Sequence, residues 1–259
     1  MIPSSLLAAI RFLTRLPVPG PDTTAEDLKF AVVWFPLIGA LLGLLVGGFH
    51  ALCVGWWPAW IAAVLTVGFG LMVTGGFHED AATDAADGLG GGWTTDDVQR
   101  IMKDSRIGAY GAMGLWCLLT FRAAALVALG SAAWLPLAAA WCWGRWSAAP
   151  LLRGLPALSS TGLSRDIGAD LPTGAVRITT VLALLITGVL LVLGMMTQDS
   201  TPWRLLLAPG AALVACVLWW AYLAKRVGGQ SGDLLGAGNQ LVECAVLLVF
   251  LATFVPATK

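Results

Sequence analysis

The stretch TGGFHEDAATDAADG, residues 74–88, places three aspartates directly after a long apolar segment. On a helix, Asp80, Asp84 and Asp87 follow i, i+4, i+7 spacing and therefore share one narrow face. Carboxylates this close together repel one another unless a positive charge lies among them. Oxygen ligands without a histidine and cysteine cluster favour Mg²⁺ or Mn²⁺, and Mg²⁺ commonly binds one or two carboxylates plus substrate phosphates. The stretch therefore predicts a metal-assisted phosphoryl-transfer site at a membrane surface.

The composition indicates an integral membrane protein. Of the 259 residues, 58% are hydrophobic and 12% are charged, whereas a soluble domain has about 25% charged residues. Several windows reach the roughly 20 apolar residues that a helix needs to cross a bilayer. The formal net charge is zero and no basic tract is present, so nothing indicates a nucleic-acid partner. The five cysteines are scattered singly, which argues against a disulfide framework or a zinc site.

Apolar segments alternate with polar loops along the whole chain. This pattern predicts an all-α, polytopic integral membrane protein with about seven transmembrane helices in a single domain, residues 1–259. Short polar loops carry the candidate site. The expected spans are Val32–Val54, Ala59–Phe77, Ala109–Leu129, Ala132–Leu151, Ile178–Met196, Leu205–Leu223 and Leu241–Val255.

The distribution of basic residues predicts which side of the membrane the polar loops face. With the N-terminus in the cytoplasm, loops 78–106, 152–177 and 225–239 are all cytoplasmic. Opposite loops hold little beyond Arg204 and the terminal Lys259, which fits the positive-inside rule. Every candidate loop then lies on one face, as a single site requires. The basic residues of the cytoplasmic loops are Arg100, Lys103, Arg106, Arg153, Arg165, Arg177, Lys225 and Arg226.

A second motif, MKDSRIG at residues 102–108, follows a predicted short helix that begins at Thr94. Lys103 and Arg106 could neutralise a diphosphate, because arginine grips phosphate oxygens in a two-pronged way. Asp104 could complete a second metal site or orient Arg106. The alternative interpretation is a topological charge cluster with a surface Asp–Arg pair.

A third motif, GGQSGDLLGA at residues 228–237, is rich in glycine. Gly229 and Gly232 could let the backbone cradle a phosphate, and Asp233 at a helix start could supply another metal ligand. Glycine-rich loops between spans are common, so this motif carries little weight by itself.

Three charged residues, Arg122, Arg145 and Glu243, fall inside apolar spans. Charges there are costly and usually face a bundle interior or an aqueous cavity. Arg145 is the best candidate for reaching a substrate, whereas Arg122 is expected to snorkel. His78 and Glu79 lie off the aspartate face. We expect His78 to form hydrogen bonds at an interface, and Glu79 to be an outer partner of the metal ligands.

Five pieces of the chain follow one another in order: FLTRLPVP (12–19), FPLIG (35–39), TGGFH (74–78) with Asp80, Asp84, Asp87 and Gly88, MKDSRIG (102–108), and GGQSGD (228–233) with LGA (235–237). In these pieces the chain resembles the cobalamin synthase family, the adenosylcobinamide-GDP ribazoletransferases. A match to five pieces in the same order is highly specific evidence for the family, although a match to any one piece is weak evidence. Two positions depart from the family pattern: Ala81 stands where glycine is common, and Glu79 where leucine is common. Neither removes a carboxylate. Loop 153–177 matches poorly, which leaves its residues without an assigned role.

The resemblance implies the final assembly step of the cobalamin nucleotide loop. Adenosylcobinamide-GDP and α-ribazole would give adenosylcobalamin and GMP, and α-ribazole 5′-phosphate would give adenosylcobalamin 5′-phosphate. It implies Mg²⁺ as the metal, with Mn²⁺ as the alternative, and a multi-pass protein of the bacterial inner membrane. The partners are these two substrates and the lipid bilayer; a homo-oligomer is left open.

The residues that match the motifs take the following roles. Asp80, Asp84, Asp87 and Asp233 are assigned to metal. Asp84, Asp87 and Asp104 are the catalytic candidates. Substrate binding is assigned to Lys103, Arg106, Gly229 and Gly232, and also to Arg145, which lies outside the motifs and is chosen because it is a charge within an apolar span.

Two other functions are compatible with parts of the sequence. DAADG at residues 84–88 echoes the start of the D-x-x-D-G motif of CDP-alcohol phosphotransferases, which make lipids, but LGGG follows and the rest of that motif is missing. A cation transporter could use the acidic cluster as an ion site. Transport sites usually lie near the bilayer midplane, whereas these aspartates lie at a span's end beside basic residues.

Overall fold

The computed structural model describes residues 3–169, 171–197 and 202–252. The expected positions 253–255 of the last span, and Lys259, lie outside the described residues. In the described part of the chain the structure is helical, with one isolated bridge between Ala157 and Gln230 and no other extended pairing. The all-α fold class is therefore confirmed.

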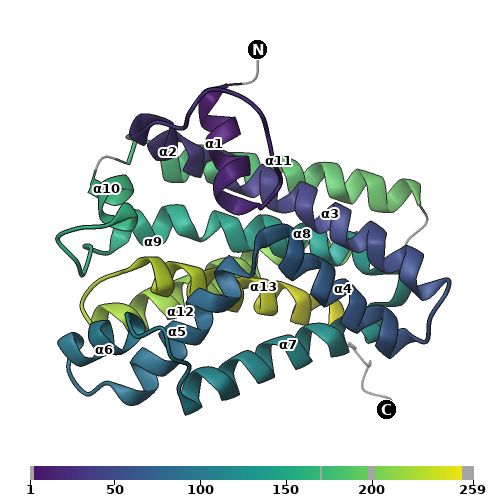
Figure 1. Ribbon diagram of the computed structural model, residues 1–259. Coiled ribbons are helices and arrows are strands. Elements are labelled where there is room, and N and C mark those ends of the chain that lie inside the picture. The colour runs from purple at the N-terminus through teal and green to yellow at the C-terminus, as the bar shows by residue number, and fades with distance from the viewer. Residues whose placement is uncertain (1–2, 170, 198–201, 253–259) are drawn as a thin grey trace, which may run out of the picture.

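The helices are arranged as a bundle with its long members running side by side (Figure 1). In chain order they are α1 (Ser4–Leu13), α2 (Ala25–Ala31), η1 (Val32–Trp34), α3 (Phe35–Val54), α4 (Ala59–Thr74), α5 (Phe77–Gly91), α6 (Thr95–Met102), α7 (Ala109–Leu129), η2 (Gly130–Ala133), α8 (Trp134–Trp146), α9 (Ala148–Gly154), α10 (Leu163–Ala169), α11 (Ala175–Met196), η3 (Pro202–Leu206), α12 (Ala208–Arg226) and α13 (Gly232–Leu251).

By length and composition, five helical stretches of the described chain could cross a membrane, or six if the bent pair α4 and α5 is one span. About seven spans were expected. The difference arises because one stretch, Ala109–Gly154, has 46 residues, which at 1.5 Å per residue is about twice the thickness of a bilayer core. It contains both the third and the fourth expected span.

The chain turns back within this stretch at Gly130, whose φ of 56° suits glycine. Near the end of α7, the Leu126 carbonyl accepts a hydrogen bond from His50 Nε2 at 3.2 Å. At the start of α8, Trp134 lies against Gly47, one turn before His50. Helices α7 and α8 therefore form an antiparallel hairpin beside α3.

Two expected boundaries are wrong. The second span ends at Thr74 instead of Phe77, because Gly75 and Gly76 have φ of 73° and 66°, and α5 leaves α4 at 94°. Only glycine adopts two successive left-handed conformations at low cost. The expected loop up to Asn239 ends earlier, since Ser231 accepts a hydrogen bond from the Leu234 amide and α13 begins at Gly232.

Helix α3 packs unusually closely against α8. A Cβ atom on Gly39, Gly43 or Gly47 would lie within 2.6 Å of the backbone of α8. These glycines recur every fourth residue and so form one smooth face. In a lipid environment such small-residue faces let helix backbones approach each other, and van der Waals contact then replaces the hydrophobic effect as the packing force.

The three polar loops meet at one end of the bundle, on the left in Figure 1. Leu158 donates a backbone hydrogen bond to the Gln230 carbonyl at 2.9 Å, which joins the second loop to the third. Arg226 donates to the carbonyl of Trp93 in the first loop. The expectation that all candidate loops gather on one face is thereby confirmed.

We predict different effects on stability for Gly43→Ala and Gly48→Ala, two substitutions on the same helix. A methyl group at position 43 would lie 2.5 Å from the Leu137 carbonyl oxygen, whereas nothing lies within 4 Å at position 48. Gly43→Ala should lower stability by about 1–3 kcal/mol. Gly48→Ala should leave it unchanged or raise it by up to about 1 kcal/mol, because alanine favours the helix. Thermal unfolding in detergent measures both, and equal melting temperatures would contradict the close packing.

Candidate active site

The first turns of α5 and α13 lie side by side at the polar end of the bundle. Their contact is close, since a Cβ atom on Gly236 would lie 2.4 Å from that of Ala81. Asp80 lies in the first turn of α5, and Asp233 in the first turn of α13. Helix N-termini carry partial positive charge, which stabilises carboxylates there. Two chain segments whose aspartates are 153 residues apart in the sequence thus bring acidic side chains together.

Asp84 is the central member of this acidic group. It is half-buried and lies within electrostatic range of Asp80, Asp87 and Asp233. The expected helix and shared face are confirmed, since all three aspartates of the sequence motif lie on α5. In the described structure, neither Asp80 nor Asp84 has a basic or hydrogen-bonding partner for its carboxylate. These oxygens are free to bind a ligand.

Asp87 differs from its neighbours because the backbone already holds it. Its two carboxylate oxygens accept hydrogen bonds from the amides of Gly108 and Gly111, each at 2.7 Å. Both amides belong to the start of α7, so the buried carboxylate satisfies donors that a helix N-terminus leaves unpaired. A side chain on either glycine would collide with the Asp87 carboxylate. Asp87 therefore joins α5 to α7, and only its remaining lone pairs are available to a metal.

The Lys103–Arg106 segment connects α6 to α7 at the edge of the acidic group. As expected, α6 begins at Thr94, which forms a capping box with Asp97. Arg106 grips Asp104 through two side-chain hydrogen bonds, Nε to Oδ1 at 3.0 Å and Nη2 to Oδ2 at 2.6 Å. These bonds lower the pKa of Asp104 to about 2. Asp104 is therefore ionised at neutral pH, and it is a weak proton acceptor that orients Arg106.

The two candidate glycines of the third motif have different surroundings. A Cβ atom on Gly229 would lie 2.6 Å from the Pro156 carbonyl oxygen, so this glycine allows the second and third loops to pack. Gly232 has open space around its Cα and lines a cavity. Of the two, only Gly232 is placed to approach a ligand.

This cavity, of about 410 Å³, is the main feature that the sequence did not reveal. Its walls include the first turns of α5 and α13 and part of loop 153–177, to which no role had been assigned. Lys103 and Arg145, two of the predicted substrate-binding residues, also line it. Phe12, Phe35 and Phe77 lie in quoted motifs, and their recurrence there was the available signal.

A buried network of four charges lies directly beneath the site. Glu243 on α13 pairs with Arg122 on α7 and with Arg145 on α8. Arg122 also pairs with Glu79 on α5, as well as bonding to Gln240. The expectation that Arg122 snorkels is therefore wrong, because its side chain is only 11% exposed and both of its ion-pair partners lie inside the bundle.

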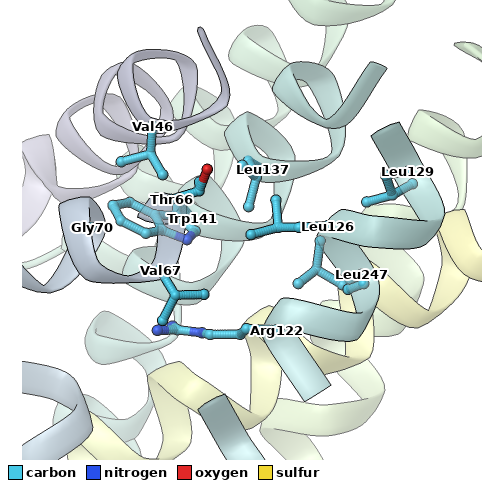
Figure 2. A pocket seen from close by; sticks show the side chains of 11 residues that line it. Val46, Thr66, Val67, Gly70, Arg122, Leu126, Leu129, Leu137, Trp141 and Leu247 are labelled. Carbon is cyan, nitrogen blue, oxygen red and sulfur yellow. The ribbon is translucent and has the colours of Figure 1, made fainter. Parts of the chain in front are cut away.

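Figure 2 shows Arg122 at the edge of a second, much smaller cavity among α3, α4, α7, α8 and α13. Its volume of about 20 Å³ suits about one water molecule. The walls are mainly apolar; Trp141, for example, lies beside Gly70. This space offers no path for a hydrated cation, and so it does not favour the transporter interpretation.

Comparison with known proteins identifies the family. The family model described as cobalamin-5-phosphate synthase matches residues 5–251. The chain belongs to the cobalamin-5-phosphate synthase family. Its similarity to proteins named adenosylcobinamide-GDP ribazoletransferase extends over nearly the full length of both chains. A relative from Vibrio vulnificus is 37% identical over 251 residues, which is 94% of each chain. One from Brevibacillus brevis is 32% identical, covering 97% of this chain and 99% of the relative. No solved structure matches.

The two departures from the cobalamin-5-phosphate synthase pattern have structural roles. Ala81, in place of the common glycine, packs its methyl group against Gly236 of α13. Glu79, in place of the common leucine, pairs with Arg122. Glu79 was expected to support the metal ligands, but its partner in the structure is this arginine. Both departures therefore concern helix packing and leave the aspartates unchanged.

The donor set suits a hard divalent cation. Asp80, Asp84 and Asp233 supply oxygen atoms only, and two of the three have no competing partner. In the part of the chain that the structure describes, no three acidic, histidine or cysteine side chains already converge on one point. Mg²⁺ commonly takes one or two carboxylates and completes its shell with substrate phosphates and water. Two of these aspartates suffice for such a site.

We predict that Glu243→Gln destabilises the protein strongly. It removes the carboxylate that two buried arginines share, and breaking a buried ion pair costs about 3–5 kcal/mol. The melting temperature in detergent should fall well below that of wild type. Glu26→Gln, the same chemical change at an exposed position of α2, is the control and should have no effect. A Glu243→Gln protein as stable as wild type would contradict the network.

Proposed function

We propose that this chain is a Mg²⁺-dependent adenosylcobinamide-GDP ribazoletransferase. It joins adenosylcobinamide-GDP and α-ribazole to give adenosylcobalamin and GMP, and it converts α-ribazole 5′-phosphate to adenosylcobalamin 5′-phosphate. Membership of the family is the observation that carries the proposal. The carboxylates of Asp80 and Asp84, which have no protein partner within the described residues, support it together with the basic residues at the same end of the bundle, because this combination suits a reaction at a diphosphate.

The reaction exchanges one phosphorus–oxygen bond for another. A ribose hydroxyl of α-ribazole attacks the cobinamide-side phosphorus, the bond from this phosphorus to the bridging oxygen breaks, and GMP leaves with that oxygen. The attacking hydroxyl is not the 5′ one, because a substrate phosphorylated there keeps its phosphate in the product. Such transfers depend on positioning and charge neutralisation, with little covalent chemistry for the protein.

The basic residues contribute charge at the edge of the site. Arg106 is 86% exposed and is oriented by Asp104, so its guanidinium can bind a diphosphate without being withdrawn from a buried pair. Lys103, at the neighbouring cavity, can bind the same group from another side. When bound, Mg²⁺ would neutralise diphosphate charge and stabilise the departing GMP.

One of the acidic residues accepts the proton of the attacking hydroxyl, and this general base is a carboxylate other than Asp104. A general base works best with a pKa near the operating pH, and the pKa of Asp104 is about 2. Asp87 is already occupied by two backbone amides. Asp80, Asp84 and Asp233 therefore share the metal and proton-acceptor roles.

The site lies on the cytoplasmic side of the bacterial inner membrane. The exposed basic residues of the α6 region, including Arg100, Lys103 and Arg106, lie at the same end of the bundle as the aspartates. The positive-inside rule places that end in the cytoplasm. GMP would then be released into the cytoplasm.

We expect Asp84→Asn to reduce Mg²⁺-dependent GMP release by about a hundredfold or more, since removing one preorganised electrostatic group costs about that much. The assay combines purified protein, adenosylcobinamide-GDP, α-ribazole and Mg²⁺. The melting temperature should not fall, because the carboxylate has no protein partner. Asp96→Asn, at an exposed site on α6, is the control. Near-normal turnover by Asp84→Asn would sink the metal assignment.

Arg106→Ala should raise the KM for adenosylcobinamide-GDP or slow the transfer step, while leaving the fold intact. The matched control is Arg100→Ala, because Arg100 forms an exposed pair with Asp97 at 3.0 Å but lies outside the motif. Exposed pairs contribute about 0–1 kcal/mol to stability, so neither variant should unfold. Identical kinetics for the two variants would rule out a diphosphate role for Arg106.

A further inference from the structure

The 410 Å³ cavity has a distinct distribution of polar and apolar surface. Its wall is aromatic: Phe12 stacks on Phe35 with ring centres 5.5 Å apart, and Phe77 meets Phe12 edge-on at 5.3 Å. Leu152 and Ile167 extend this apolar wall. Flat rings packed this way offer surface suited to another flat, apolar ring.

Buried polar groups also line the cavity, and one of them, His78, meets the Phe77 ring edge-on at 5.1 Å. His78, Arg145 and Asn239 are at most 6% exposed, and all three line it. His78 Nδ1 and Arg145 Nε have no hydrogen-bond partner within the described structure. Buried polar atoms normally have partners, so such orphans indicate a ligand. The cavity thus has the mixture typical of small-molecule sites, apolar walls with a few polar groups.

The size of the cavity selects among the parts of the two substrates. Pockets of about 300–1,000 Å³ hold drug-sized ligands, and 410 Å³ is at the lower end of that range. A nucleoside, with about 20 non-hydrogen atoms, fits this space, whereas the corrin-bearing substrate, with about 100, does not. The corrin must therefore stay outside.

The chemistry of the walls selects between the two nucleosides. Guanine has donors and acceptors along its edge, which burial against phenylalanine would leave unpaired at a cost. The dimethylbenzimidazole base of α-ribazole is apolar except for one free ring nitrogen. That nitrogen could accept a hydrogen bond from the partnerless Nδ1 of His78, in the neutral tautomer that has its hydrogen on Nδ1, and the ribose hydroxyls can bond to Arg145 or Asn239.

On the basis of the proposed function, we propose that this cavity binds α-ribazole, with its base against the aromatic wall. Gly232 and His78 line the cavity, and they lie in or beside the turns that carry Asp233 and Asp80. A nucleoside held here brings its ribose close to the aspartates. The nucleotide diphosphate and corrin then approach from outside, past Lys103.

Filling the cavity tests this assignment. Ala148 is half-buried on α9 and lines the cavity. We expect Ala148→Phe to raise the KM for α-ribazole at least about tenfold, while the KM for adenosylcobinamide-GDP stays within about twofold. Ala224→Phe, at an exposed position of α12, should change neither. A raised KM for adenosylcobinamide-GDP alone, or an unchanged KM for α-ribazole, overturns the assignment.

Direct binding separates this inference from the proposed function. Isothermal titration of wild type with α-ribazole alone should show binding that Ala148→Phe weakens about tenfold and that GMP does not compete away. If wild type binds α-ribazole in this way but never releases GMP, the proposed function fails and the cavity assignment stands. If wild type releases GMP but GMP displaces α-ribazole from the cavity, the assignment fails and the function stands.

A second variant covers the case in which Ala148→Phe does not fold. Phe77→Leu removes an aromatic wall that is 40% exposed, so it should cost little stability. It should weaken α-ribazole binding severalfold, because a stacking surface is lost. Wild-type affinity in Phe77→Leu would contradict stacking on this wall.

Discussion

The pairing of the buried Glu243 carboxylate with two arginines is the interaction on which the rest of the bundle depends. It lies on α13 and neutralises Arg122 of α7 and Arg145 of α8, while Arg122 extends the network to Glu79 of α5. Two acids and two bases cancel, which lets four charges exist in an apolar interior where an uncompensated one would be very costly. Of the four helices that contribute, α5 and α13 carry the aspartates and α7 binds Asp87. The network therefore fixes the framework under the site.

Above this network, the protein has to hold several carboxylates close together. Helix N-termini at α5 and α13 offset part of their repulsion. Asp87 is stabilised in another way, by two backbone amides of α7. The double-glycine bend at Gly75 and Gly76 makes the arrangement possible, because it ends α4 and starts α5 in a new direction. A straight helix through residues 59–91 would have no N-terminus at Asp80.

Much of the fold and of the acidic site could be predicted from local patterns. Apolar windows gave the long helices, and the Thr94 capping box gave the start of α6. The i, i+4, i+7 spacing placed three aspartates on one helix. The expected helix boundaries were wrong where one or two residues decide them. Two left-handed glycines end α4 early, and Ser231 caps the start of α13 within a stretch that was expected to be a loop.

Other features depend on contacts between distant residues, which a single sequence does not reveal. Nothing in the neighbourhood of Arg122 indicates that Glu79 and Glu243 will lie beside it. The role of Asp87 depends on amides more than 20 residues away. The lining of the cavity comes from α1, α3, α5, α8, α9, α13 and part of loop 153–177, among other segments, so no one segment carries its signal.

The bonds from Asp87 to Gly108 and Gly111 have a consequence for how the site responds to substrate. They act as a fixed spacer between α5 and the turn that presents Arg106, so the gap between acids and cation is set when the chain folds. Under the proposed function, a diphosphate that entered this gap would not have to pull two mobile elements together. The reorganisation that an open site would undergo at each turnover would then be completed once, during folding.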